Sequence, residues 1–196
     1  MNYTPSELKE TFGSVGKNVQ VDKSCALFGA KGIHIGSNVR IDCYTVMSAG
    51  EKGIVIGDNV HIASWAGLFG ASGTIVIEAF SGVSVRATLL TATDDFVMGF
   101  LTNPTIPAKY RYPKTGDVIL RKHALVGCGA VVLPVTLGLA ASVGALSFVD
   151  KDVGDFDVVS GCPAVKVGRR HRRILDEERR FLEEQAAAKE ADSVSS

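Results

Sequence analysis

Aliphatic residues return at every sixth position along most of the chain, in groups of three. The interval between groups is 8 or 9 residues, apart from one gap of 31 and a last gap of 5. The groups are Val15, Val21 and Leu27; Ile35, Ile41 and Met47; Ile56, Ile62 and Leu68; Ile77, Val83 and Leu89; Leu120, Val126 and Val132; and Leu137, Val143 and Val149. A six-residue repeat grouped in threes is typical of a parallel β-helix with three faces per turn. The spacing therefore predicts an all-β fold of about six coils.

Three glycine-rich segments predict that one corner of this prism recurs from turn to turn. Residues 27–36, 47–57 and 68–78 each carry a glycine-rich turn followed by Ile-x-Ile. Because alternate residues of a strand point to opposite faces, both isoleucines should lie inside and the middle residue outside. Equal turns should then stack into one column.

Both ends of the chain read as helical. Thr4, Pro5 and Glu7 have the spacing of an N-cap, a first-turn proline and a capping-box glutamate, which predicts a capping helix within residues 1–12. Residues 13–168 would form the β-helix. Residues 169–196 would form a charged helix that runs from Arg169 to about Gln185, followed by a small polar tail.

Composition narrows the class of protein. Lys+Arg and Asp+Glu are both 21, so the formal net charge is zero and nothing favours nucleic acid as a partner. The four cysteines are isolated from one another, which favours a reduced cytoplasmic setting and no metal cluster. The uncharged run 124–149 is long enough to cross a bilayer, but its glycines and six-residue spacing favour the β-helix over a membrane span.

The gap of 31 residues holds a long loop, residues 90–118, which interrupts the repeat. Loops of this length in compact domains are usually functional or disordered. Aromatic, proline and charged residues predict an ordered loop that binds a ligand and reaches a neighbouring subunit. The candidate side chains are Asp94, Asp95, Asn103, Tyr110 and Arg111.

Four motifs together resemble the hexapeptide-repeat acyltransferases, the left-handed parallel β-helix family that uses acyl-coenzyme A. They lie at residues 56–62, 126–134, 143–152 and 161–164 (Gly-Cys-Pro-Ala). Within the family, residues 94–96, 101–104 and 118–123 are similar to the acetyltransferases of nucleotide-linked amino sugars, of the dTDP-4-amino-4,6-dideoxyglucose type. The resemblance implies a homotrimer with sites between subunits and acetyl-CoA as cosubstrate. It also implies N-acetylation of a nucleotide-linked deoxyamino sugar for surface polysaccharide (O-antigen) biosynthesis.

Acyl transfer needs a base, and histidine is the natural base near neutral pH. The family's loop histidine is absent here, since residues 90–118 contain no histidine. His123 follows the loop directly at a corner, which makes it the first candidate for the base. His61, on an outward strand position, is the second. Asp94 and Asp95 would orient the base or hold the acceptor's amino group, with loop capping as the alternative role.

The resemblance also implies where the coenzyme lies. Backbone amides near Gly127, Ala145 and Ser147 would meet the pantetheine arm. Lys151, Lys166 and Arg170 would neutralise the phosphates.

Two other functions remain open. One is O-acetylation of a galactoside or other glycan hydroxyl. The other is a non-catalytic β-helix or a γ-carbonic-anhydrase-like protein, which would need three histidine ligands on neighbouring turns.

Overall fold

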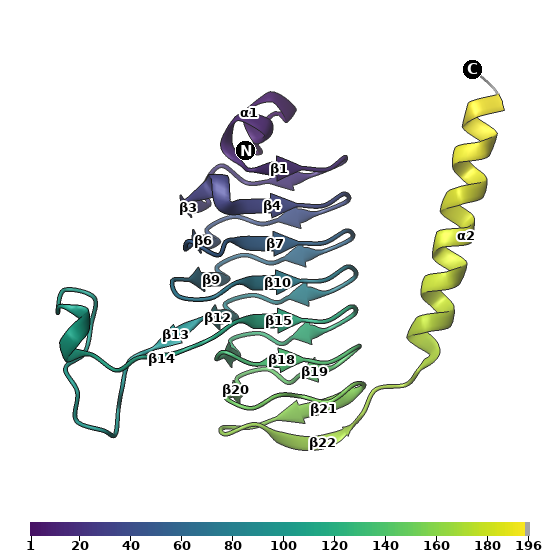
Figure 1. The fold of residues 1–196 in the computed structure, drawn as a ribbon. Coiled ribbons are helices and arrows are strands. Elements are labelled where there is room, and N and C mark those ends of the chain that lie inside the picture. The colour runs from purple at the N-terminus through teal and green to yellow at the C-terminus, as the bar shows by residue number, and fades with distance from the viewer. Residues whose placement is uncertain (195–196) are drawn as a thin grey trace.

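Three sheets of short strands, parallel except for the last strand of one sheet, form the walls of a triangular prism in a computed structural model, which describes residues 1–194 (Figure 1). Sheet I contains β1 (Ser14–Val15), β4 (Ile33–Ile35), β7 (Ile54–Ile56), β10 (Ile75–Ile77), β15 (Val118–Leu120) and β18 (Thr136–Leu137). Sheet II contains β2 (Gln20–Val21), β5 (Arg40–Ile41), β8 (His61–Ile62), β11 (Gly82–Val83), β16 (Leu125–Val126), β19 (Ser142–Val143), β21 (Asp157–Ser160) and β22 (Val165–Arg169). Sheet III contains β3 (Ala26–Phe28), β6 (Val46–Ala49), β9 (Gly67–Gly70), β12 (Thr88–Leu90), β17 (Val131–Val132) and β20 (Phe148–Val149).

The predicted parallel β-helix is confirmed, and the repeat fixes its register. Ile35, Ile56, Ile77, Leu120 and Leu137 pair in succession along sheet I, so the six-residue groups stack as vertical rows. These rows form one continuous buried core. In the Ile-x-Ile strands the isoleucines are buried and the middle residue faces outward, as predicted.

At two of the three corners, nearly every turn bends between sheets through a residue with left-handed backbone angles. At the corner between sheets I and II these residues are Asn18, Asn38, Asn59, Phe80, His123, Ala140 and Phe156. At the corner between sheets II and III they are Tyr44, Trp65, Arg86, Gly129 and Leu146. Asparagine tolerates this conformation well, whereas bulky side chains adopt it at a cost. The two columns therefore mark where side chains project outward at fixed intervals of about 4.8 Å.

The third corner, between sheets III and I, carries the stacked glycine-rich turns and the long loop. The backbones of two successive turns approach closely there, since the Gly50 amide donates to the Gly70 carbonyl at 3.0 Å. The loop leaves this corner through a two-stranded antiparallel neck of β13 (Ala92–Thr93) and β14 (Lys114–Thr115). Beyond the neck it forms an arm that stands away from the prism and includes the 3-10 turn η2 (Ala108–Tyr110) (Figure 1). A similar turn, η1 (Ala30–Gly32), lies in the same corner near the start of the prism.

The N-terminal helix α1 (Pro5–Thr11) closes the first turn of the prism. The predicted capping box is present, because Thr4 Oγ1 accepts from the Glu7 amide and the Glu7 carboxylate accepts from the Thr4 amide. Leu8 and Phe12 are buried against the core. The helix thus covers apolar residues at the open end of the solenoid.

The C-terminal segment differs from the prediction at both of its ends. Arg169 lies in β22, which folds back antiparallel on β21, so the helix α2 begins only at Arg173. It continues to Val194, past the predicted end near Gln185, because residues 186–188 are alanines that favour helix. The last two residues, 195–196, lie outside the described residues. Neither helix in residues 1–194 is long and apolar enough to cross a membrane.

The start of α2 is fastened to the corner between sheets I and II. The Glu178 carboxylate accepts from His123 Nε2 at 2.7 Å and also contacts the Lys122 ammonium. The Arg170 guanidinium donates to the His123 carbonyl at 2.7 Å. Phe181 packs edge-to-face on Phe80, with ring centroids 5.9 Å apart. We call this set of contacts the helix clasp.

The contribution of Glu178 to the stability of the helix clasp depends on pH. Burial by itself would raise the pKa of Glu178, but the hydrogen bonds and positive charge of Lys122 and His123 outweigh it and lower that pKa below its ordinary 4.5. A carboxyl whose pKa is lowered by folding stabilises the native state at neutral pH. It loses that contribution as the pH falls below about 4.5 through the lowered pKa.

The Glu178→Gln variant should lower the free energy of unfolding by about 1.5–3 kcal/mol at pH 7, the range for a hydrogen bond to a charged group. The difference from the unmodified chain should shrink as the pH falls below about 4.5. Thermal unfolding at several pH values measures it. Glu177→Gln is the matched control, because Glu177 pairs, among the described residues, with exposed Arg173 and Arg180 on its own helix. If the two variants lost the same free energy of unfolding at pH 7, the stabilising role of the Glu178 contacts in the helix clasp would be contradicted.

Candidate active site

His123 does not lie beside the long loop as the sequence suggested. The loop leaves the corner between sheets III and I, whereas His123 stands one sheet further along, in the column of left-handed residues between sheets I and II. Its ring is 4% exposed, stacks on Phe80 at 5.2 Å and bonds to Glu178. His123 is thus a buried corner residue, because α2 covers its side chain.

His61 faces solvent on sheet II and is held by a carboxylate. Its Nε2 lies 2.8 Å from Asp42 Oδ2, and its side chain is 52% exposed. Burial of Asp42 works to raise its pKa, but hydrogen bonds from His61 and Arg40 prevail and lower it. The pair has the geometry of a base whose orientation is fixed by a carboxylate.

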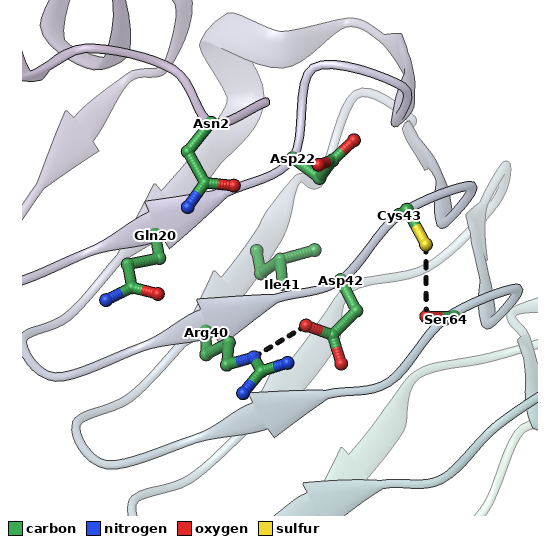
Figure 2. Close-up of a pocket in the computed structure, with 8 residues that line it drawn as sticks. All are labelled: Asn2, Gln20, Asp22, Arg40, Ile41, Asp42, Cys43 and Ser64. Atoms are coloured by element: carbon green, nitrogen blue, oxygen red, sulfur yellow. Dashed lines mark hydrogen bonds and ion pairs between the residues drawn. The ribbon is translucent and has the colours of Figure 1, made fainter.

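A polar pocket opens beside this pair on the first turns of sheet II. It holds about 270 Å³ and is lined by Asn2, Gln20, Asp22, Arg40, Ile41, Asp42, Cys43 and Ser64. Figure 2 shows Arg40 turned toward Asp42, joined by a 2.6 Å ion pair, and Cys43 turned toward Ser64. Hydroxyl, amide, carboxylate and guanidinium groups thus converge on one small volume, which suits a polar ligand.

The adjoining corner between sheets II and III carries exposed aromatic side chains. Tyr44 and Trp65 stack with centroids 4.5 Å apart and are 52% and 54% exposed. Arg86 follows on the next turn, also exposed. We call Tyr44, Trp65 and Arg86 the open column. Sequence reasoning missed it; the available signal was a bulky residue at the turn position that holds asparagine in Ser37-Asn38-Val39 and Asp58-Asn59-Val60.

The predicted coenzyme residues divide among three places. Gly127, Ala145 and Ser147 lie together at the corner between sheets II and III, on later turns of the prism than the open column. The backbones of Gly127 and Ala145 are in close contact there. Ser147 is 2% exposed, and its hydroxyl accepts from the Gly161 amide at 3.2 Å. Its side chain is thus engaged within the chain.

The three predicted phosphate-binding cations are not together. Lys151 and Lys166 line one pocket of about 180 Å³ at the last turn of the prism, where Lys166 pairs with Asp157 at 2.7 Å. Arg170 lies at another corner, in the helix clasp, where burial lowers its pKa. Two of the three cations therefore share a surface.

The two aspartates of the arm differ in the hydrogen bonds that they accept. Asp95 accepts from the backbone amides of Val97, Met98 and Phe100 at 2.8–3.0 Å, and these bonds lower its pKa. This is loop capping. Among the described residues Asp94 accepts a single bond, from the Asn103 amide at 3.1 Å, and it lines a pocket of about 770 Å³ between the arm and Asp150. Asp94 thus keeps acceptor capacity for a ligand.

The remaining arm candidates also have distinct surroundings. Asn103 accepts from the amide and the hydroxyl of Thr105, which closes a turn. Tyr110 is half-exposed and lies 4.9 Å from the Lys109 ammonium. The Arg111 Nε is buried without a hydrogen-bond partner among the described residues. A buried donor left unpaired is costly to the native state.

A metal site does not form among the histidines. His34 bonds to Ser14 on sheet I, His61 to Asp42 on sheet II and His123 to Glu178 at the corner between them. No cluster of three or more ligand side chains is present in the part of the chain that the structure describes. The three histidines of a γ-carbonic anhydrase site are thus not brought together.

Comparison with known proteins identifies relatives over nearly the whole chain. No protein-family model matches. The dTDP-4-amino-4,6-dideoxy-D-glucose acyltransferase of Escherichia coli is 38% identical over 177 residues, which is 89% of this chain and 92% of the relative. A chloramphenicol acetyltransferase of Klebsiella aerogenes is 34% identical over only 68 residues, which cover 34% of this chain and 31% of that protein.

Solved structures include similar enzymes. The N-acyltransferase AntD from Bacillus cereus, in complex with dTDP and 3-hydroxybutyryl-CoA, superposes with a TM-score of 0.91 at 37% identity, covering 94% of this chain and 98% of AntD. A galactoside acetyltransferase bound to coenzyme A shares the fold at 19% identity, with a TM-score of 0.53 over 86% of this chain and 70% of that one. The chain therefore belongs to the hexapeptide-repeat acyltransferases, in the family of dTDP-4-amino-4,6-dideoxyglucose acyltransferases.

Proposed function

We propose that this protein transfers an acetyl group from acetyl-CoA to the amino group of a nucleotide-linked 4-amino-4,6-dideoxy sugar. The observation that carries the proposal is 38% identity over 89% of the chain to an enzyme named for that acceptor. The AntD complexes with dTDP and coenzyme A supply the second support. The product would enter surface polysaccharide (O-antigen) biosynthesis. A cytoplasmic location is part of the proposal and fits four free cysteines.

This N-acylation reaction does not require a strong general base. The acceptor ammonium gives one proton to water, the neutral nitrogen attacks the thioester carbon, and the tetrahedral oxyanion collapses to an amide and the coenzyme A thiolate. The thiolate takes up the proton that the nitrogen sheds. Amino groups in peptides have pKa values of about 7.7–8.0, so a sizeable share of such an amine is neutral near pH 7.5. Positioning therefore matters more than strong basicity.

We propose Asp94 as the residue that holds the acceptor's amino group. Its carboxylate accepts one hydrogen bond in the chain, whereas that of Asp95 is occupied by the arm backbone. Of the two histidine candidates, His61 is the one that a substrate can reach, because α2 covers His123. His123 is then a residue that fastens α2, and the base role assigned to it from the sequence is tested below.

We propose that the active unit is a homotrimer with sites between subunits. Asp94 projects from the corner between sheets III and I, while the polar pocket and the predicted coenzyme residues Gly127 and Ala145 lie elsewhere on the prism. The arm stands away from its own prism (Figure 1). Its tip exposes Phe96, Val97, Met98, Leu101 and Tyr112. Apolar surface of this kind marks a protein contact, and a neighbouring prism would bury it.

The purified protein should release coenzyme A thiol when given acetyl-CoA and dTDP-4-amino-4,6-dideoxyglucose, and the product should survive mild base because it is an amide. A thiol reagent follows the release. No release with any nucleotide amino sugar would refute the function. A product whose acetyl group leaves in mild base would instead indicate an ester and O-acetylation.

Asp94→Asn should lower kcat/KM by at least about tenfold, because a hydrogen bond to a charged group contributes about 1.5–3 kcal/mol. His123→Ala should lower the thermal stability and leave kcat within about tenfold of the unmodified enzyme. Steady-state kinetics on folded variants, with His61→Ala alongside, separate these roles. A hundredfold loss of kcat in a stably folded His123→Ala enzyme would restore His123 as the base.

Light scattering should give the active protein three times the 20.7 kDa mass of the chain. Met98→Asp should reduce this mass and the activity together, because it places a charge in the apolar arm tip, where Met98 is 70% exposed. Val167→Asp, at an exposed position in β22 away from the arm, is the control. A fully active monomer would contradict the assembly.

A further inference from the structure

We infer that the tip of the arm (residues 96–112) docks into a groove of a second copy of this chain, between α2 and the corner that carries Phe80 and His123. This inference rests on the homotrimer of the proposed function. It adds the surface of the next subunit that receives the arm, and thereby the direction in which the arm carries Asp94.

The receiving surface is an apolar groove that its own chain leaves open. It holds about 320 Å³, and Phe80, Ile174, Phe181 and the His123 ring form most of its wall. Phe181 remains 39% exposed although it packs on Phe80 with ring centroids 5.9 Å apart. One side of the groove is fixed by the helix clasp, because Glu178 bonds to His123 at 2.7 Å. The groove is therefore a preformed site for a large apolar side chain.

The arm tip presents such side chains from an ordered backbone. Phe96 is 86% exposed, and Val97 beside it is 88% exposed. The Asp95 carboxylate holds the backbone that follows it through bonds from three amides, and Phe100 stacks on Tyr112 with ring centroids 5.3 Å apart. A preorganised apolar tip loses little conformational entropy on docking.

The charges of the two surfaces are complementary. The arm tip contains Lys109 and Arg111 and no acidic residue. Glu177 and Glu178 line the groove but already pair within their own subunit. Glu184 lies seven positions after Glu177, on the same face of α2, and is exposed. We assign this carboxylate to the exposed ammonium of Lys109.

The arm and α2 are placed as a closed ring requires. Figure 1 shows them on opposite sides of the prism. A cyclic trimer repeats one heterologous contact, so each subunit must offer two different surfaces that fit each other.

The arm is also long enough to make this contact. Residues 94–113, beyond the neck, form two legs of about ten residues, each of which spans at most about 35 Å. One side of the prism, about six residues long, spans about 20 Å. The arm can therefore cross sheet II of the next subunit. Asp94, at the root of the arm, would then face the corner with that subunit's Gly127 and Ala145.

Photocrosslinking tests the contact directly. With Phe96 replaced by p-benzoylphenylalanine, irradiation of the intact protein should join two chains. The captured peptide should contain residues 173–184 of α2 or the corner at Phe80. The same photoreactive group at exposed Val167, in β22 away from the arm, is the control for random collisions. Capture of any other segment, or no crosslink between chains of the assembled protein, would overturn the docking.

Charge reversal tests the pair of Lys109 and Glu184. Lys109→Glu and Glu184→Lys should each raise the concentration at which the assembly dissociates by about tenfold, because repulsion replaces attraction at every contact of the ring. The double variant should return to within about threefold of the unmodified protein, since the two reversed charges again attract. Asp176→Lys is the control, because Asp176 pairs with Arg179 on a part of α2 away from the groove. Light scattering over a dilution series measures the dissociation, and a double variant no tighter than the single variants would contradict the docking.

Failure of this inference can be told from failure of the proposed function. A trimer that transfers the acetyl group but captures another segment would leave the function standing and place the arm on a different surface. A protein that assembles through the groove but releases no thiol with any nucleotide amino sugar would refute the function and leave the docking intact.

Discussion

The in-register stacking of buried aliphatic side chains is the constraint on which the rest of this protein depends. Each inward residue pairs with its counterpart one turn away, so every turn must have the same three sides. The energy comes from removing these side chains from water, at about 25 cal/mol per Å² of apolar surface. Because the stack permits no slippage, corner residues also align in columns, and chemistry on this scaffold is laid out along those columns.

The two columns of left-handed residues show how one backbone position serves two purposes. Between sheets I and II, the asparagines give way to Phe80, His123 and Phe156, whose bulk supports α2 or the final turn. Between sheets II and III, Tyr44 and Trp65 remain in solvent. The difference arises from the route of the C-terminal segment, which leaves β22 and covers one corner only. Exposure of a side chain is thus decided by a distant segment.

The candidate residues for catalysis and binding are spread over separate corners of one chain. Asp94 lies on the arm, His61 on sheet II, and Gly127 and Ala145 at the corner beyond it. A rigid prism cannot bend to bring them together, since each of its strands, apart from those at the two ends of a sheet, is tied to two neighbours. The arm, which is joined to the prism through a two-stranded neck, is the element that can extend to a second prism.

The sequence by itself determined the β-helix, its register, the capping box at Thr4, the site of the arm and the family. Each follows from local spacing or short motifs, which act over a few residues or repeat regularly. Only the tertiary structure decided that His123 is covered, that Asp95 caps its own loop while Asp94 stays available, and that Arg170 joins the helix clasp. These outcomes depend on contacts between residues as many as 55 positions apart, such as His123 with Glu178, which no six-residue pattern encodes.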